Sequence, residues 1–150
     1  MPPIYRGLFI PDEVESILRD LPAWFGIEEA IRDYAEAARK TPAYAAAADD
    51  AIVGVCLVRR HNAHAAELTL LAVRPTHHRR GLGQALVTAA ETDLAADGAE
   101  YLQVKTLGPS RESAEYAATR RFYEALGYRP LEEMHGLWPG NPCLIMVKRL

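Results

Sequence analysis

The sequence predicts an α/β domain of the α+β type, with a mixed, mostly antiparallel sheet of six to seven strands and about four helices on its faces. Three observations lead to this fold class. Short polar turns join three strand-like segments early in the chain, which is typical of antiparallel hairpins. A strand–helix–strand unit follows, and such a unit pairs its two strands in parallel. The length of 150 residues suits one core, so we expect a single domain over residues 1–150.

Two helices are predicted before the hairpin strands. Pro11-Asp12-Glu13 is typical of a helix start, and apolar residues then recur at helical spacing until Pro22 ends the pattern. The apolar face consists of Val14, Ile17, Leu18 and Leu21. A second helix is expected from about Ile27 to Arg39, with Tyr34 on its apolar side. Thr41-Pro42 stops this helix, because the residue before a proline disfavours helical backbone.

Three strands are expected next, at residues 44–48, 52–58 and 67–73. Asp49-Asp50 before the second strand is typical of a turn, and the polar stretch 59–63 separates the second strand from the third. Two hairpin connections in a row predict an antiparallel start to the sheet.

The second half of the chain alternates helices and strands. A long helix is predicted from Gly81 to about Asp97, with apolar residues at helical spacing, and Gly98 ends it. A strand at 101–106 and a helix at 114–125 follow. Two last strands, 128–134 and 143–148, complete the sheet, and residues 135–142 are predicted to form a long loop between them that could act as a substrate lid.

The composition argues against several classes of protein. The net charge of −3 and the short basic cluster Arg79-Arg80 speak against a nucleic-acid binder. No apolar run approaches the roughly 20 residues that a membrane helix needs. The N-terminal residues lack an apolar core with a cleavage site, so we expect no signal peptide and a cytoplasmic location. Cys56 and Cys143 lie in apolar runs and are expected to be buried thiols.

No metal is expected, because the histidines do not show metal-ligand spacing. The five histidines are His61, His64, His77, His78 and His135.

The segment from Val73 to Leu86 has features that favour the binding of an anion. A helix N-terminus offers free N–H groups and a partial positive charge, and glycines at 81 and 83 let a ligand approach the backbone. The Rossmann fingerprint requires glycine where Leu86 stands, and the P-loop requires a Gly-Lys-Ser/Thr sequence that is absent. The segment therefore predicts a pyrophosphate site of another kind, the alternative being a surface turn whose glycines only cap a helix.

This segment resembles motif A of the GNAT superfamily of N-acetyltransferases, written Arg/Gln-x-x-Gly-x-Gly/Ala after a strand that ends Val-x-Pro. Val73, Pro75 and Gly81-Leu82-Gly83 match the motif, whereas His78 stands where Arg or Gln is usual. The order of elements over about residues 44–148 is also similar to the family, which implies a GNAT-like mixed sheet.

The resemblance implies acetyl-CoA as cosubstrate. The strand after the long helix should splay away from strand 67–73 and leave a slot for the thioester. The end of strand 67–73 should meet the pantetheine arm, and the turn should wrap the pyrophosphate. The cofactor-binding residues implied in this way are Leu71, Ala72, Val73, His78, Arg79, Arg80, Gly81, Leu82, Gly83 and Gln84.

Transfer of acetyl to an amine requires a weak acid for the leaving thiolate. Tyr123 is the candidate, because Phe122-Tyr123 and Gly127-Tyr128 resemble motif B of the same superfamily, Phe-Tyr-x-x-x-Gly-Phe/Tyr, whose Tyr commonly protonates that thiolate. Tyr116 and Thr119, further upstream, replace the more usual Asn and Ala of the motif. The alternative is that Tyr123 is only a core residue.

The reaction also requires a base, because a primary amine is mostly protonated at neutral pH. Glu67 is the candidate, since the histone-acetyltransferase branch has its base at the matching place of a similar strand. Strand alternation predicts that Glu67, Thr69 and Leu71 share one face. The alternatives are a water chain or one of three residues near the last hairpin, Glu132, Glu133 and His135.

The acceptor side is less defined. Trp24 and Phe25 lie in the joint between the first two helices, which borders the acceptor site in this fold. The two rings could form a wall of the acceptor site against an apolar or cationic group of the substrate. The alternative is that both rings only seal the core. The acceptor is expected to be a small-molecule or peptide amine, and a homodimer is an option because related enzymes are often dimers.

The sequence therefore predicts an N-acetyltransferase that moves acetyl from acetyl-CoA to a primary amine by direct attack. No covalent enzyme intermediate is implied, because neither cysteine is expected near the slot. One alternative is a regulatory module that binds acyl-CoA without catalysis. Another is an acetyltransferase toxin acting on charged tRNA, against which the net charge of −3 argues.

Overall fold

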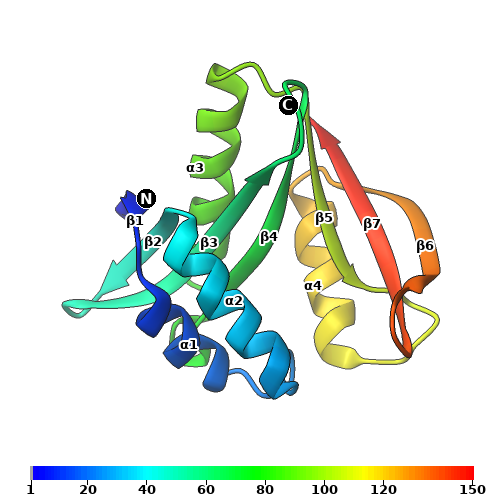
Figure 1. Ribbon diagram of the computed structural model, residues 1–150, viewed down its shortest axis with the longest axis horizontal. Helices are drawn as coiled ribbons and strands as arrows, with labels where there is room; N and C mark the ends of the chain where they lie inside the picture. The colour runs from blue at the N-terminus through cyan, green and yellow to red at the C-terminus, as the bar shows by residue number, and fades with distance from the viewer. Residues whose placement is uncertain (1) are drawn as a thin grey trace.

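The computed structural model describes residues 2–150 and contains one seven-stranded sheet with four α-helices (Figure 1). The sheet order is β1-β2-β3-β4-β5-β7-β6, and β4–β5 is its one parallel pair. This confirms the predicted mixed, mostly antiparallel sheet. The elements are β1 (Ile4–Leu8), α1 (Pro11–Arg19), α2 (Glu28–Lys40), β2 (Ala43–Ala48), β3 (Ala51–Arg60), β4 (Ala65–Val73), α3 (Leu82–Ala96), β5 (Tyr101–Leu107), α4 (Ala114–Ala125), β6 (Arg129–Trp138) and β7 (Asn141–Arg149).

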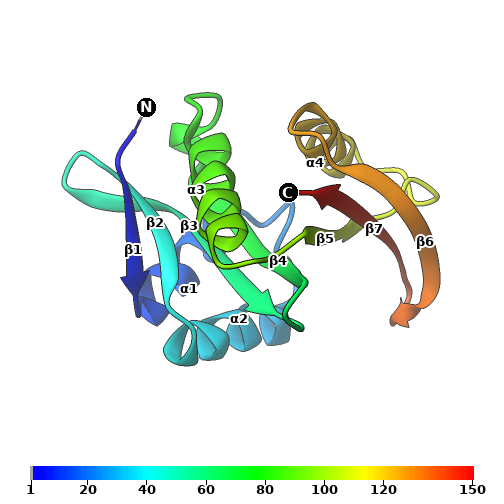
Figure 2. The ribbon, with the colours of Figure 1, turned by 90° about the horizontal axis from the view of Figure 1, so that it is seen from above.

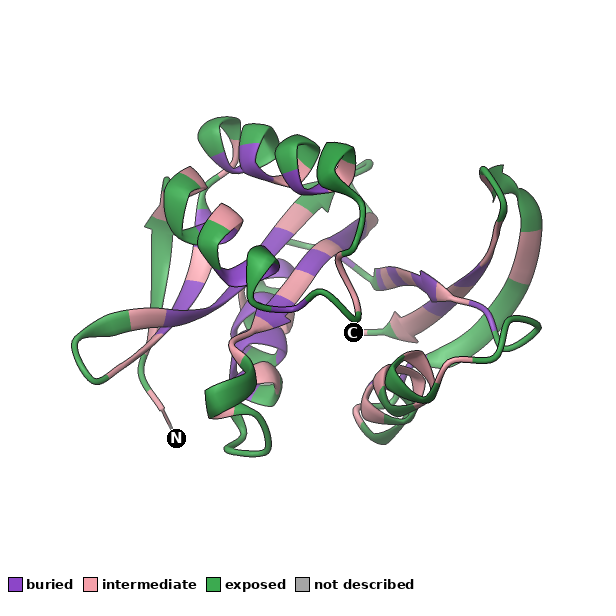
Figure 3. Ribbon diagram, turned by 90° about the horizontal axis from the view of Figure 1, so that it is seen from below, coloured by how far each residue is buried: buried purple, intermediate pink, exposed green. Residues whose placement is uncertain are grey.

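The helices cover both faces of the sheet. Helices α1 and α2 lie on one face, and α3 and α4 lie on the other (Figure 2). Figure 3 shows that the buried residues of the helices face the strands. Two apolar clusters result, one between α1, α2 and the sheet and one between α3, α4 and the sheet. The amphipathic spacing read from the sequence therefore places each helix against the sheet.

Two local features differ from the sequence-based expectation. The edge strand β1 was not predicted, because three of its five residues are exposed and no apolar alternation marks it. The long loop predicted at 135–142 is wrong, because β6 runs to Trp138 and β7 begins at Asn141, with these two residues paired. Pro139 and Gly140 form the tight turn, and Gly140 supplies the positive φ of 71° that such a turn requires.

A β-bulge interrupts β4 at Thr69. Val58 of β3 pairs with Leu68 and Leu57 pairs with Leu70, so Thr69 is the extra residue between them. An extra residue reverses the alternation of side chains beyond it. Leu68 accordingly packs in the α3 cluster, whereas Leu70 packs in the α1–α2 cluster.

The bulge corrects one expectation about β4. Leu71 packs on the α3 side, opposite Leu70 and Ala72, so the prediction that Glu67 and Leu71 share a face is wrong. The physical reason is that period-2 alternation holds only in an unbroken strand.

The parallel strands β4 and β5 part at the same place. Their pairing runs from Ala65↔Tyr101 to Leu68↔Val104 and stops one residue before the bulge. Beyond it, β4 stays paired with β3 while β5 stays paired with β7, and the two strands diverge (Figure 1). This confirms the predicted splay of the two strands.

Candidate active site

The turn that follows β4 leads directly into the N-terminus of α3. Pro75–His77 forms a short 3-10 turn, and Arg79 and Gly81 adopt left-handed backbone, with φ of 62° and 78°. No side chain caps α3, and the N–H of Ala85 donates to Gly81 O at 3.0 Å. The N–H groups of the three preceding helical residues have no carbonyl one turn back, so they remain available to an anion.

The two glycines of this turn are required for different reasons. Gly81 needs its positive φ, and a Cβ there would meet no atom within 4 Å. Gly83 has ordinary helical backbone, but a Cβ there would lie 3.3 Å from Cζ of Phe122 on α4. Gly83 therefore brings α3 close to α4, in addition to any close approach by a ligand.

Arg79 and Arg80 are exposed, and neither forms an ion pair or side-chain hydrogen bond within residues 2–150. Two unpaired guanidinium groups beside free N–H groups form a cationic site that suits phosphate oxygens. The cofactor contacts implied for this turn and for the end of β4 remain predictions.

His78 binds the end of β4. Its Nε2–H donates to Val73 O at 2.7 Å, and its ring lies edge-on to Trp24 at 5.8 Å between centroids. A carbonyl has two lone pairs, so Val73 O keeps one for a further donor. The residue that departs from motif A thus shapes the turn through this backbone contact.

Tyr123 lies on α4 against the α3-side core. It is 7% exposed, and its ring packs edge-on to Phe122 and Tyr128 at 5.2 and 5.5 Å. Burial, with smaller effects from Cys56 and Tyr34, raises the pKa of the Tyr123 hydroxyl above its usual value. The hydroxyl is therefore protonated at neutral pH, as a proton donor must be.

Glu67 lies in the paired part of β4 and is 6% exposed. Its Oε1 accepts hydrogen bonds from His61 Nε2 at 2.8 Å and Gln103 Nε2 at 3.1 Å, and lies 3.3 Å from Lys105 Nζ. Burial raises the pKa of Glu67, but these three groups together outweigh it and leave the pKa below the usual value. The carboxylate is thus ionised, and partnered through one of its two oxygens.

The three rival bases lie on β6. Glu132 and His135 are exposed. Glu133 Oε1 accepts from the Ser110 hydroxyl at 2.6 Å and from its N–H at 3.1 Å, and these bonds lower the pKa of Glu133. A carboxylate held in this way at the β5–α4 loop is suited to fixing that loop.

Trp24 and Phe25 are both partly buried at the edge of the α1–α2 core. Trp24 Nε1 donates to Thr119 Oγ1 at 3.2 Å, and Trp24 O accepts from the Tyr116 hydroxyl at 2.8 Å. The two motif departures on α4 therefore anchor the α1–α2 loop. Phe25 packs edge-on to Tyr34 at 5.9 Å. A substrate contact for either ring remains a prediction.

Tyr34 is the site residue that the sequence analysis missed. Burial and then the Glu67 carboxylate raise its pKa, and the Tyr34 hydroxyl in turn raises the pKa of Tyr123. Tyr34 therefore lies within electrostatic range of both catalytic candidates. Its place on the apolar face of a predicted helix was the available signal, and it was read as packing alone.

The cysteines are buried, as predicted. Cys56 lies on β3 and Cys143 on β7, so neither is on β4 or β5, the two strands that diverge. The expectation that neither cysteine lies near the slot remains a prediction. Burial raises the pKa of the Cys56 thiol to about 12, which keeps it protonated and unreactive.

Within residues 2–150, none of the helices combines the length and the apolar character that a membrane span requires. No group of three or more His, Cys, Asp or Glu side chains in the same range is arranged to hold a metal ion.

Comparison with solved structures gives the same fold. A protein from Desulfovibrio desulfuricans, described as a GNAT-family acetyltransferase, superposes with a TM-score of 0.84 at 20% identity, over 99% of both chains. A GNAT family acetyltransferase from Elizabethkingia anophelis with acetyl-CoA bound gives 0.73 at 16% identity, over 99% of this chain and 97% of that one. The ribosomal-protein-S18-alanine N-acetyltransferase from Escherichia coli gives 0.76 at 19% identity, over 99% and 94%.

The sequence comparisons address the family itself. No curated protein matched the sequence. The sequence profile of the acetyltransferase (GNAT) domain matches residues 39–130, which include β4, the turn, α3 and both motifs. The chain therefore belongs to the GNAT acetyltransferase domain family.

Proposed function

We propose that this chain is an N-acetyltransferase that moves acetyl from acetyl-CoA to a primary amine by direct attack in a ternary complex. The observation that carries the proposal is the parting of β4 and β5 beside the uncapped N-terminus of α3. The N-terminus of α3 offers a site for the pyrophosphate. The unpaired edge at the end of β4 offers backbone groups to the pantetheine arm that is joined to it.

The proposed cofactor position follows from these groups. The pyrophosphate accepts from the free N–H groups of Leu82, Gly83 and Gln84 and pairs with Arg79 and Arg80. The pantetheine arm runs along Leu71, Ala72 and Val73, past the point where β5 leaves β4. The acetyl-CoA bound to the structural neighbour from Elizabethkingia anophelis supports this choice of ligand.

The proposed chemistry uses one base and one acid. The acceptor ammonium loses one proton to Glu67, directly or through water, and the neutral amine attacks the thioester carbonyl, so that a C–N bond forms. As the C–S bond breaks, the Tyr123 hydroxyl gives its proton to the leaving sulfur, and the second proton of the nitrogen replaces it on the Tyr123 oxygen. Direct attack is favoured over an acyl-enzyme, because both thiols are buried and burial raises their pKa.

The proposal is tested by free-thiol release. Acetyl-CoA is mixed with the protein and a panel of primary amines, namely amino acids, a polyamine and a peptide. We expect CoA thiol to appear together with an equal amount of acetylated amine by mass spectrometry. Acetyl-CoA binding without thiol release from any amine contradicts an enzymatic function.

A second candidate is a module that binds acyl-CoA without catalysis. One observation favours it: three partners hold Glu67 Oε1 and lower the pKa of Glu67, which weakens this residue as a base. The same assay separates the two candidates, because the module binds acetyl-CoA and releases no thiol.

A further inference from the structure

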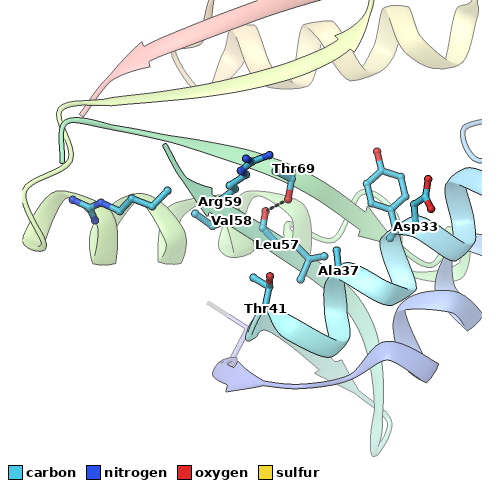
Figure 4. Close-up of a pocket in the computed structure, with 9 residues that line it drawn as sticks. Asp33, Ala37, Thr41, Leu57, Val58, Arg59 and Thr69 are labelled. Carbon is cyan, nitrogen blue, oxygen red and sulfur yellow. Dashed lines mark hydrogen bonds between the residues drawn. The ribbon is translucent and has the colours of Figure 1, made fainter. Parts of the chain in front are cut away.

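A pocket of about 510 Å³ lies between α2 and the strands β3 and β4 (Figure 4). Its volume is within the usual range for small-ligand sites. Ala37, Leu57 and Val58 supply an apolar lining, and Thr69 lines it at the bulge, where its hydroxyl donates to Leu57 O at 3.3 Å.

The pocket carries one cation and one anion that lack partners. Arg59 and Asp33 both line it, and neither forms an ion pair or a side-chain hydrogen bond within residues 2–150. In Figure 4, Asp33 lies on α2 at one end of the lining residues, whereas the Arg59 side chain lies beside Thr69. Arg60 also lines the pocket, but its guanidinium binds the Asp97 carboxylate at 2.8 Å and three backbone carbonyls. Arg59 is therefore the lining guanidinium that is available to a ligand.

The pocket adjoins the candidate catalytic residues. Arg59 pairs with Glu67 across β3 and β4, so their side chains leave the sheet on the same face. Tyr34 of α2 lines the pocket as well. The pocket therefore lies on the same face of the sheet as the proposed base, beside its cross-strand neighbour Arg59.

We propose that this pocket binds the acceptor, and that the acceptor is a small zwitterion: an amine that also carries a carboxylate, as an amino acid does. Arg59 pairs with the carboxylate, and the amine points toward Glu67 and the thioester. The inference rests on the proposed function, since it names the class of amine for that same site.

The charges also disfavour competing acceptors. A polyamine would bring only positive charge to Arg59 and would leave the guanidinium without a partner. A second carboxylate on the side chain would approach Asp33. Arg59 and Asp33 are exposed, so water and salt weaken this repulsion, and we expect a preference and not an exclusion.

The test compares amines that differ only in the carboxylate. Leucine, phenylalanine, lysine and histidine are each measured against isopentylamine, phenethylamine, cadaverine and histamine in the thiol-release assay. For the amino acid with the highest kcat/KM, we expect this value to be at least tenfold above that of the corresponding amine without the carboxylate. We also expect a higher kcat/KM for glutamine than for glutamate. Arg59→Met should abolish the tenfold preference by raising KM for the amino acid, with little change for the amine.

Arg39→Met is the matched control, because Arg39 is exposed on α2 and does not line the pocket. Thermal unfolding of both variants checks that they fold as the wild type does. Equal or better turnover of the amines without carboxylate, or a preference that survives in Arg59→Met, overturns the inference and leaves an N-acetyltransferase. Thiol release from no amine at all overturns the proposed function, and the inference with it.

Discussion

At the scale of single residues, Tyr123 is buried in the apolar cluster that also contains Leu68 and Val104, the last pair before β4 and β5 diverge. The edge-on rings of Phe122 and Tyr128 fix its orientation, and burial keeps its hydroxyl protonated. A phenol with a raised pKa is a poor acid toward bulk water. It can still protonate a thiolate that forms in the same buried space, because the thiolate is also destabilised there.

Tyr123→Phe tests this role. The substitution removes the hydroxyl and keeps the ring packing, so turnover should fall more than tenfold while acetyl-CoA binding is kept, as measured by thiol release and calorimetry. Tyr101→Phe is the control, because Tyr101 is 45% exposed on β5. An unchanged rate in Tyr123→Phe with a true acceptor excludes Tyr123 as the acid.

Glu67 links the site to pH-dependent stability. Its folded pKa lies below the usual value, so the ionised form stabilises the fold above the unfolded pKa of about 4.3, and this contribution is lost as pH falls through the lower folded pKa. Glu67→Gln should lower the free energy of unfolding at pH 7 by about 1–3 kcal/mol, because buried partners lose a charged acceptor.

Urea unfolding of Glu67→Gln and wild type from pH 7 down to about pH 2 measures this effect, because the contribution is lost below the unfolded pKa. The difference between the two proteins should shrink toward the acid end. Glu132→Gln, at an exposed position on β6, serves as the control. A difference that is constant with pH would mean that the ion pairs of Glu67 contribute no net stability.

At the scale of elements, apolar periodicity was enough to predict the four helices and most strands. It failed where the decisive feature has no periodic signal. Thr69 is an ordinary strand residue in sequence, and only the register of β3 against β4 reveals it as a bulge. β1 is an exposed edge, and Pro139-Gly140 is a turn shorter than the surrounding Gly and Pro residues suggested.

The candidate site divides in the same way. Motif residues of the turn and of α4 were predictable, because their spacing along one element carries the signal. Arg59 and Lys105 were not predictable, because they reach the site only when β3 and β5 assemble around Glu67. Their roles depend on tertiary contacts rather than on local sequence.

The contact between α4 and the α1–α2 loop predicts that the Tyr116 hydroxyl holds this loop in place. Tyr116→Phe removes the hydrogen bond to Trp24 O, whereas the hydrogen bond from Trp24 Nε1 to Thr119 Oγ1 remains. We expect stability to fall by about 0.5–1.5 kcal/mol and amide exchange to rise over residues 21–26.

Hydrogen exchange measured by mass spectrometry locates the effect. Tyr5→Phe is the control, because Tyr5 is 51% exposed on β1. If exchange rises across the whole chain and not in the loop, the bond contributes to global stability and does not hold this loop.

At the scale of the whole molecule, the sheet has two halves, β1–β4 and β5–β7, which diverge beyond Leu68. Several connections hold them together. They include the four residue pairs of β4–β5, the Trp24 loop, and Glu91 of α3, which accepts from the Tyr128 hydroxyl at 2.8 Å and from Lys148 Nζ at 3.1 Å. A ligand seated between β4 and β5 would add a further connection.

Acetyl-CoA should therefore raise the melting temperature, and the rise should depend on Arg79 and Arg80. Ligand at about 100 times its Kd stabilises by about 2.7 kcal/mol, which corresponds to roughly 5–10 °C in a domain of this size. The double variant Arg79→Gly with Arg80→Met removes both unpaired guanidinium groups, and the glycine suits the positive φ at position 79.

In calorimetric scans at a fixed acetyl-CoA concentration, this double variant should lose most of the rise in melting temperature. Arg121→Met, at an exposed position of α4, should retain the rise. A full rise in the double variant would show that the turn does not hold the phosphates, because removing two phosphate-binding charges must weaken a ligand that they contact.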